Sequence, residues 1–160
     1  MLALIAIALL NAVPPDQIVR GWEVYGDDSS CSADKTYDDD TTLSFSLDNT
    51  LDSSSITLWN NRWQSIEKDH AYVITVRFDS DEPLSFEASG MKTDSAGGIF
   101  IDSGGVQTMA RAMAAKTVTF RNGAQIIGKY DLSGSRAAML AIARCNGKAA
   151  NKRVDDPFAG

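Results

Sequence analysis

The sequence predicts an α+β fold: a mostly antiparallel β-sheet or sandwich of about seven to nine strands that carries two short helices. Three observations support this prediction. Apolar side chains alternate with polar ones through much of the chain, which is typical of half-buried strands. Short polar turn segments separate these runs, and two later segments change to a helical spacing.

The alternating runs are the expected strands. Leu43, Phe45 and Leu47 alternate with polar residues, and residues 72–78 repeat the pattern. The clearest hairpin is expected within residues 117–132, where Asn122-Gly123 supplies two residues that accept positive φ in a tight turn. Further strands are expected at residues 22–25, 32–37, 56–59, 84–88 and 98–101.

The first helical segment has apolar residues at positions 106, 109, 110 and 113, which is the spacing of one helix face. Asp102 or Ser103 is available to cap its first turn. We therefore expect a short helix directly after the strand at residues 98–101.

The second helical segment places Ala138, Ile142 and Cys145 on one stripe. We expect this helix to begin near Ser133 or Ser135 and to stop at Asn146-Gly147. Its stripe would then turn Cys145 toward the core.

The ends of the chain differ from its middle. Residues 1–12 contain an uncharged apolar run that is too short to span a bilayer and that resembles the apolar core of a secretory signal peptide. An uncleaved anchor or a buried N-terminal element are the alternatives. We expect a single β-rich globular domain at residues 13–147 and, because residues 148–160 have charge and no period, a flexible tail there.

Composition limits the classes of partner. Hydrophobic residues make up 44% of the chain and charged residues 22%, which suits a folded domain. The formal net charge is −6, with no basic stripe, and this argues against nucleic acid or an anionic membrane surface. We expect no stable membrane span after cleavage of the N-terminal segment.

Cys31 and Cys145 are the two cysteines of the chain and lie 145 − 31 = 114 positions apart. An even pair is expected to cross-link in an oxidising compartment, so the sequence predicts a disulfide and a periplasmic or secreted location. Two free buried thiols, or a reactive or metal-binding thiol, are the alternatives.

Asp102-Ser103-Gly104-Gly105 resembles the active-site sequences of two protease classes. For an aspartic protease, one such Asp would need a second chain to complete the carboxylate pair. For a chymotrypsin-like protease, the Gly before the nucleophile is missing and His70 lacks that family's sequence context. The simpler interpretation is a strand that ends in a glycine turn, and we predict no catalytic residues.

Two other groups of residues are candidates for binding. The acidic run at residues 38–40 lacks the spacing of a calcium loop, so we expect a solvated hairpin tip, and we predict neither a metal site nor a cofactor. The candidate binding residues are Trp59, Asn61, Arg62 and Trp63, which combine aromatic rings with polar side chains as in a sugar or peptide groove. Tryptophans that simply fill the core are the alternative.

The order of several features resembles a group of small secreted proteins of Gram-negative bacteria. These features are an opening tryptophan, a cysteine, a late strand, helix and hairpin, a Gly-Ser turn, and an Ala-rich helix that ends in a second cysteine. They are carried by Trp22, Cys31, Leu132-Ser133-Gly134-Ser135, Ala137, Ala138 and Cys145. The chain is similar in this respect to the invasion-associated locus B proteins. The resemblance implies a β-rich periplasmic or secreted domain without an established enzymatic activity, and it implies no catalytic residues.

The sequence therefore leads to three functional hypotheses. The first is a non-enzymatic periplasmic or secreted domain that binds a protein or a component of the cell envelope. The second is a small hydrolase or protease built around Asp102 or Ser103. The third is a glycan-binding module that uses Trp59 and Trp63.

Overall fold

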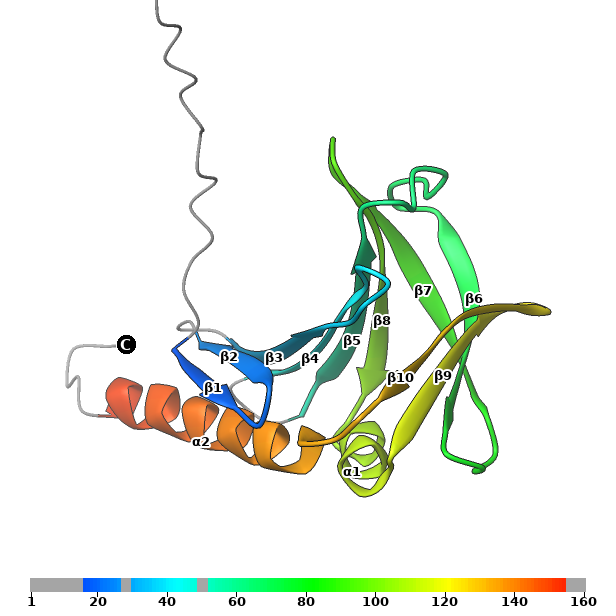
Figure 1. Cartoon of the computed structure of the whole chain (residues 1–160). Helices are drawn as coiled ribbons and strands as arrows, with labels where there is room; N and C mark the ends of the chain where they lie inside the picture. Colours follow the sequence, from blue (N-terminus) through cyan, green and yellow to red (C-terminus); the bar gives the residue numbers. More distant parts are fainter. Residues whose placement is uncertain (1–15, 27–29, 49–51, 155–160) are drawn as a thin grey trace, which may run out of the picture.

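The computed structural model describes residues 16–26, 30–48 and 52–154, with the side chains of the last helix described up to residue 146. These residues form one open antiparallel sheet of ten strands in the order β1-β2-β3-β4-β5-β8-β7-β6-β9-β10 (Figure 1). The strands are β1 Gln17–Val19, β2 Trp22–Gly26, β3 Ser30–Thr36, β4 Thr42–Asp48, β5 Ser54–Asn60, β6 Ala71–Phe78, β7 Leu84–Lys92, β8 Gly97–Gly104, β9 Thr117–Asn122 and β10 Gln125–Asp131. The helices are α1 Gln107–Ala114 and α2 Ser135–Val154.

The prediction of a mostly antiparallel α+β fold is confirmed, and its strand count is wrong. The sheet has ten strands rather than seven to nine, because the short β1 pairs with β2 and has too few residues to show an alternating pattern. Of the two predicted alternatives, a sheet or a sandwich, the strands form one open sheet. The nine strands that the alternation predicts are all present.

The sheet curls until β10 returns to the turn between β3 and β4 (Figure 1). The Tyr37 hydroxyl donates a hydrogen bond of 2.6 Å to the main-chain oxygen of Asp131, and the Lys35 ammonium lies 3.3 Å from the Asp131 carboxylate. The rings of Tyr37 and Tyr130 pack with their centroids 4.7 Å apart. Side-chain contacts therefore join β10 to the region of the β3–β4 turn, whereas main-chain hydrogen bonds join β10 to β9.

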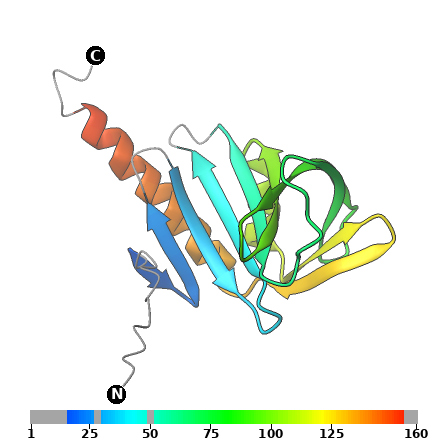
Figure 2. The same ribbon diagram turned by 90° about the horizontal axis from the view of Figure 1, so that it is seen from above.

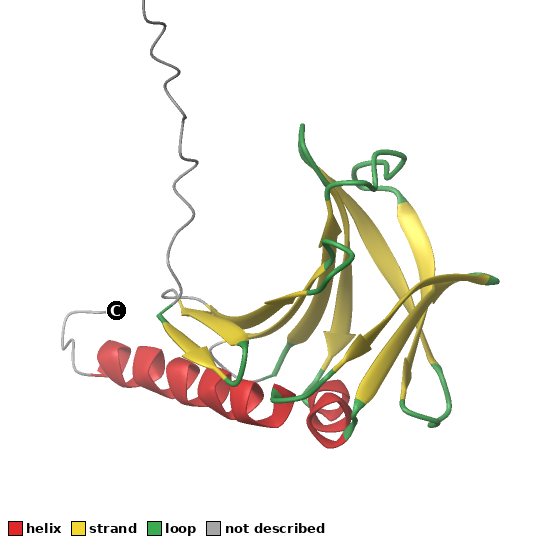
Figure 3. Cartoon of the chain, viewed as in Figure 1, coloured by secondary structure: helices red, strands yellow, loops and turns green. Residues whose placement is uncertain are grey.

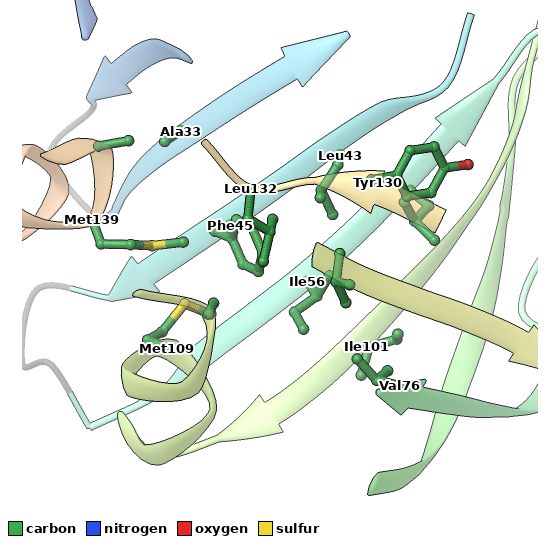
Figure 4. Packing of buried hydrophobic residues seen from close by; sticks show 14 of the residues in the cluster. Ala33, Leu43, Phe45, Ile56, Val76, Ile101, Met109, Tyr130, Leu132 and Met139 are labelled. Carbon is green, nitrogen blue, oxygen red and sulfur yellow. The ribbon is translucent and has the colours of Figure 1, made fainter. Parts of the chain in front are cut away.

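The core lies inside this curl. On β4, for example, Leu43, Phe45 and Leu47 are buried and their neighbours are partly exposed, as the alternation predicts. Figure 4 shows side chains from β3, β4, β5, β6, β8, β10 and both helices meeting around Phe45 and Leu132. Sheet and helices thus share one hydrophobic core.

Both helices lie at the base of the curled sheet (Figure 3). Helix α2 runs across β1, β2, β3 and β4 and also contacts α1 (Figure 2). Its buried face includes Ala138, Met139 and Ile142, in agreement with the predicted stripe.

Trp22 connects the start of the domain to the turn that precedes α2. Its indole nitrogen donates a hydrogen bond of 3.0 Å to the Ser133 carbonyl, and its ring packs against Phe45 with a centroid distance of 5.7 Å. The Lys35 ammonium lies 5.6 Å from the centroid of the Trp22 ring. Trp22 is completely buried, so its single polar atom has a partner inside the protein.

The predicted disulfide is confirmed. Cys31 of β3 and Cys145 of α2 are bonded, with a Cα–Cα distance of 6.2 Å. The alternative of two free thiols is therefore wrong. A disulfide of this kind is typical of proteins from oxidising compartments.

The predicted ends of the helices need correction. Helix α1 begins after Val106, which has no side-chain capping bond, because Asp102 and Ser103 belong to β8 and bond elsewhere. Helix α2 does not stop at Asn146-Gly147 but continues to Val154. The residues after Gly147 include Ala and Lys, which have high helix propensity, and one glycine costs a helix only about 1 kcal/mol.

Among the described residues, no helix is both long enough and apolar enough to cross a membrane. The predicted signal peptide at residues 1–12 and the end of the predicted tail at residues 155–160 lie outside the described residues.

Reduction of the disulfide should lower the free energy of unfolding by roughly 4 to 5 kcal/mol, because the cross-link closes a loop of more than one hundred residues in the unfolded chain. Urea unfolding followed by tryptophan fluorescence, with and without reductant, measures the difference. The double variant Cys31→Ala/Cys145→Ala is the control and should not respond to reductant. Equal unfolding curves for the oxidised and reduced wild-type protein would contradict the expectation.

Candidate binding site

The segment between β5 and β6, residues 61–70, folds over the inner face of the sheet, and we call it the strap. It crosses the sheet at Gly97 and Gly90. A Cβ atom on Gly97 would overlap the Trp63 main-chain oxygen, and one on Gly90 would overlap the Glu67 main-chain oxygen. The strap therefore lies directly on the sheet backbone, at two positions that accept no side chain.

Hydrogen bonds hold the strap in place. The Asp69 N–H donates to the Gly90 carbonyl, and the Gly90 N–H donates to the His70 carbonyl, both at 2.8 Å. The Glu67 N–H donates to the Tyr72 hydroxyl at 3.1 Å, and the Lys92 ammonium donates to the Gln64 carbonyl. The strap is thus ordered by the domain itself, before any ligand binds.

The β9–β10 hairpin faces the strap. Its two-residue turn is Gly123-Ala124, with Gly123 at a φ of 57°, and Asn122 pairs with Gln125. The predicted turn at Asn122-Gly123 is therefore one residue too early. The pairing slips between Ile126 and Gly128, which leaves Ile127 as the extra residue of a β-bulge.

This bulge determines the directions in which the side chains of Ile126 and Ile127 point. In a regular strand, Ile126 and Ile127 would point to opposite faces of the sheet. The extra residue breaks the alternation, so that both isoleucines line the same pocket. Ile127 packs against the core, and Ile126 remains 59% exposed at the rim.

Strap, hairpin and sheet enclose a pocket of about 290 Å³, which we call the strap pocket. Its lining includes five isoleucines and two aromatic rings, and polar and apolar atoms contribute almost equally to its surface. Polar side chains from the strap and the hairpin complete it. The lining residues are Arg62, Trp63, Ser65, Ile66, Tyr72, Ile74, Ile99, Asn122, Gln125, Ile126 and Ile127.

One polar side chain of the strap pocket already has hydrogen-bond and ion-pair partners within the described residues, and three do not. The Arg62 guanidinium donates to the Asp39 carbonyl and lies 3.4 Å from the Asp40 carboxylate. The side chains of Ser65, Asn122 and Gln125 make no hydrogen bond with the part of the chain that the structure describes. The one cationic side chain in the lining is therefore paired, while three neutral polar groups are free to bind a ligand.

The acidic run at residues 38–40 forms the turn between β3 and β4 and contacts the strap pocket through Arg62. Asn60 donates to the Asp39 carbonyl and to the Thr41 hydroxyl, both at 2.9 Å. The Tyr130 hydroxyl donates to the Asp39 carboxylate at 3.2 Å, and burial together with this carboxylate raises the pKa of Tyr130. The described residues contain no group of three or more potential metal-binding side chains.

The structure separates the four predicted binding residues. Arg62 and Trp63 line the strap pocket, and Asn61 is exposed on the strap outside it. Trp59 pairs with Gly98 and covers it on the opposite face of the sheet, away from the pocket. Trp59 and Trp63 therefore do not form one aromatic surface.

The residues of the hydrolase hypothesis make hydrogen bonds within the end of β8 and with β5. Ser103 is 8% exposed, and its hydroxyl lies 2.7 Å from the Ser54 hydroxyl. The Asp102 carboxylate accepts a hydrogen bond of 2.9 Å from the Gly104 N–H.

His70 lies beside the end of β8 that is opposite to Ser103. His70 bonds to Gly90, and Gly90 pairs with Ile99. Ile99 is four residues from Ser103 along an antiparallel strand, which is about 13 Å. His70 is therefore too far from Ser103 to act as its base.

The sequence does not indicate the hairpin residues of the strap pocket. Alternation predicts a regular strand there, and Ile126-Ile127-Gly128 also resembles the apolar-apolar-Gly triplet of aspartic proteases, so nothing in the sequence marks Asn122, Gln125, Ile126 and Ile127 as pocket residues. The signal that was available is the adjacent pair Ile126-Ile127, which breaks the period of two just before Gly128.

Comparisons with protein-family models, with curated proteins and with solved structures give no match to this chain.

The opposite face of the sheet carries an unfavourable pair of acidic residues. Asp34 of β3 lies directly across from Glu23 of β2. Burial raises the pKa of Asp34 and the Glu23 charge adds to this rise, while hydrogen bonds from Ser44, at 2.5 Å, and from Ser32 oppose it. Ionised Asp34 therefore weakens the fold.

The variant Asp34→Asn should be more stable than the wild type at pH 7, by a few tenths of a kcal/mol to about 1 kcal/mol, as expected for like charges on paired strands. Because the pKa is raised in the folded state, the penalty of ionised Asp34 disappears as the pH falls to the pKa of the unfolded chain. The gain should therefore shrink toward pH 3 to 4 in thermal unfolding experiments. Asp94→Asn, at an exposed turn, is the control. A gain that is constant with pH would disprove this account.

The variant Gly97→Ala should displace the strap, because the new methyl group would overlap the Trp63 carbonyl. We expect a loss of about 1 to 3 kcal/mol of stability, as is common for overpacked sites. The Asp69 amide should also lose protection from hydrogen exchange. Gly105→Ala is the matched control, since its methyl group would meet the flexible end of Gln107. Equal effects of the two variants would argue against a strap that rests on Gly97.

Proposed function

We propose that this protein is an exported, non-enzymatic binding domain of the periplasm or extracellular space, and that the strap pocket receives an apolar group of a partner protein or envelope component. The observation that carries this proposal is the preformed pocket itself. It is concave, and it combines isoleucine side chains and two aromatic rings with a few free polar groups, a combination that suits a ligand site.

The exposed isoleucine at the rim of the strap pocket supports an interaction with a partner. Ile126 is 59% exposed and continues the apolar surface of the pocket outward. Contact with a partner at this rim is favourable, because burying apolar surface contributes about 25 cal/mol of free energy per Å². The bulge that places Ile126 and Ile127 together gives the hairpin a role beyond closing the sheet.

Export is supported by the disulfide between Cys31 and Cys145. The residues that carry the resemblance to the invasion-associated locus B proteins also lie together in space. Trp22 bonds to the turn at Ser133, and Cys145 of the following helix bonds to Cys31. We therefore propose that this protein is related to that group, for which no enzymatic activity is implied.

The proposal predicts that the strap pocket binds a neutral apolar dye, N-phenyl-1-naphthylamine, with one saturable site per chain. Ile126→Asp should weaken this binding about tenfold or more, because a loss of about 1.4 kcal/mol of apolar contact corresponds to a factor of ten. A fluorescence titration of the oxidised protein measures both effects.

Ile18→Asp is the matched control, because Ile18 is 69% exposed on β1, far along the sheet from the pocket. It should leave the affinity unchanged. Dye binding that does not saturate, or that falls equally in the two variants, would overturn the proposed site.

A further inference from the structure

We infer that the group bound in the strap pocket is a single large apolar side chain, preferably aromatic, of a peptide segment, and that Asn122 and Gln125 bind the peptide groups on either side of it. This inference rests on the proposed function and specifies its ligand. It follows from the size of the strap pocket, from its charge and from the positions of its free polar groups.

The size favours one side chain. The strap pocket measures about 290 Å³, at the lower limit of the 300 to 1,000 Å³ that is common for sites of small-molecule ligands and cofactors. A long acyl chain would need a deeper channel, and the strap blocks such a channel where it lies on Gly97 and Gly90. One large side chain fits the available depth.

The walls favour an aromatic ring. Trp63 and Tyr72 supply two rings, and Ile74 and Ile99 of the sheet belong to the same lining. Aromatic pairs contribute roughly 0.5 to 1.5 kcal/mol beyond the area that they bury. A glycan, in contrast, has more hydroxyl groups than the three free polar side chains, Ser65, Asn122 and Gln125, can bind.

The charges favour a neutral group. Arg62 is the one cationic residue in the lining, and it is already engaged by the Asp39 carbonyl and the Asp40 carboxylate. No carboxylate belongs to the lining residues of the strap pocket. A charged ligand group would therefore lose its hydration without gaining an ion pair.

The free polar groups match a peptide. Asn122 and Gln125 stand side by side as a cross-strand pair at the end of the hairpin. Each side-chain amide offers both a donor and an acceptor, which is the complement of a peptide N–H and C=O. The adjacent Ile126 then covers the residue next to the bound side chain.

The recognition would use side chains rather than an added strand. The free edge of β10 carries the bulge at Ile127 and the charged Lys129, two features that oppose pairing with another strand. The hairpin end, with its two amides and Ile126, is the part that remains available for contact.

The test is an NMR titration of the intact oxidised protein, labelled with ¹⁵N, with four probes. N-acetyl-tryptophan amide carries the ring and two peptide groups, and N-acetyl-glycine amide carries the peptide groups alone. Decanoate represents an acyl chain, and N-acetylglucosamine represents a glycan. We expect saturable shifts with the tryptophan probe at the amides of residues 65–66 and 122–127, with a dissociation constant of roughly 1 mM, and none with the other three.

Two sets of variants test the proposed contacts. Asn122→Ala/Gln125→Ala should weaken the tryptophan probe at least threefold but leave 3-methylindole, which has no peptide groups, unchanged. Asn61→Ala is the matched control, because Asn61 is an exposed amide of the strap outside the lining. An equal loss for both compounds would show that the two amides do not bind peptide groups, and the inference would fail.

The remaining outcomes separate this inference from the proposed function. If the dye binds, and decanoate or N-acetylglucosamine causes saturable shifts while the tryptophan probe causes none, the strap pocket is a binding site but the peptide assignment is wrong. If neither the dye nor any probe binds, both proposals fail.

Discussion

The return of β10 to the turn between β3 and β4 is the constraint on which the other features depend. Tyr37, Tyr130 and Asp131 make this contact with side chains, while the backbone of β10 continues the ladder of β9. Without it, the β9 and β10 end of the sheet would lie open, and the core around Phe45 and Leu132 would lose one wall. The hairpin end that lines the strap pocket is held by the pairing of β9 with β6, and the contact at Asp131 fixes the opposite end of β10.

The base of the curled sheet and its opposite opening are covered in different ways. At the base, α1 and α2 supply apolar side chains, and the bond between Cys31 and Cys145 joins α2 to β3. At the other end, the strap covers the sheet with main chain, over two glycines. The base is therefore a packed core, whereas the strap leaves a space that its own side chains do not fill.

Much of the fold could be predicted from the sequence, because alternation is a local property of each strand. It was sufficient for β4 and β6, where one face is buried and the other is open to solvent. It was insufficient for β1, with three residues, and for the bulge at Ile127, where the extra residue depends on the pairing with Phe120 and Arg121. The candidate site was found in part for the same reason: Trp63 and Arg62 are chemically conspicuous, whereas Asn122 and Ile127 acquire their place from contacts between distant segments.

The way in which the strap is held has a kinetic consequence. The bonds at Gly90 and the close contact at Gly97 order the strap in the free protein. A ligand therefore meets a finished surface and does not have to order a loop, which otherwise costs part of the binding energy. Association should then be limited by diffusion and orientation, and differences in affinity among related partners should be expressed mainly in how long each remains bound.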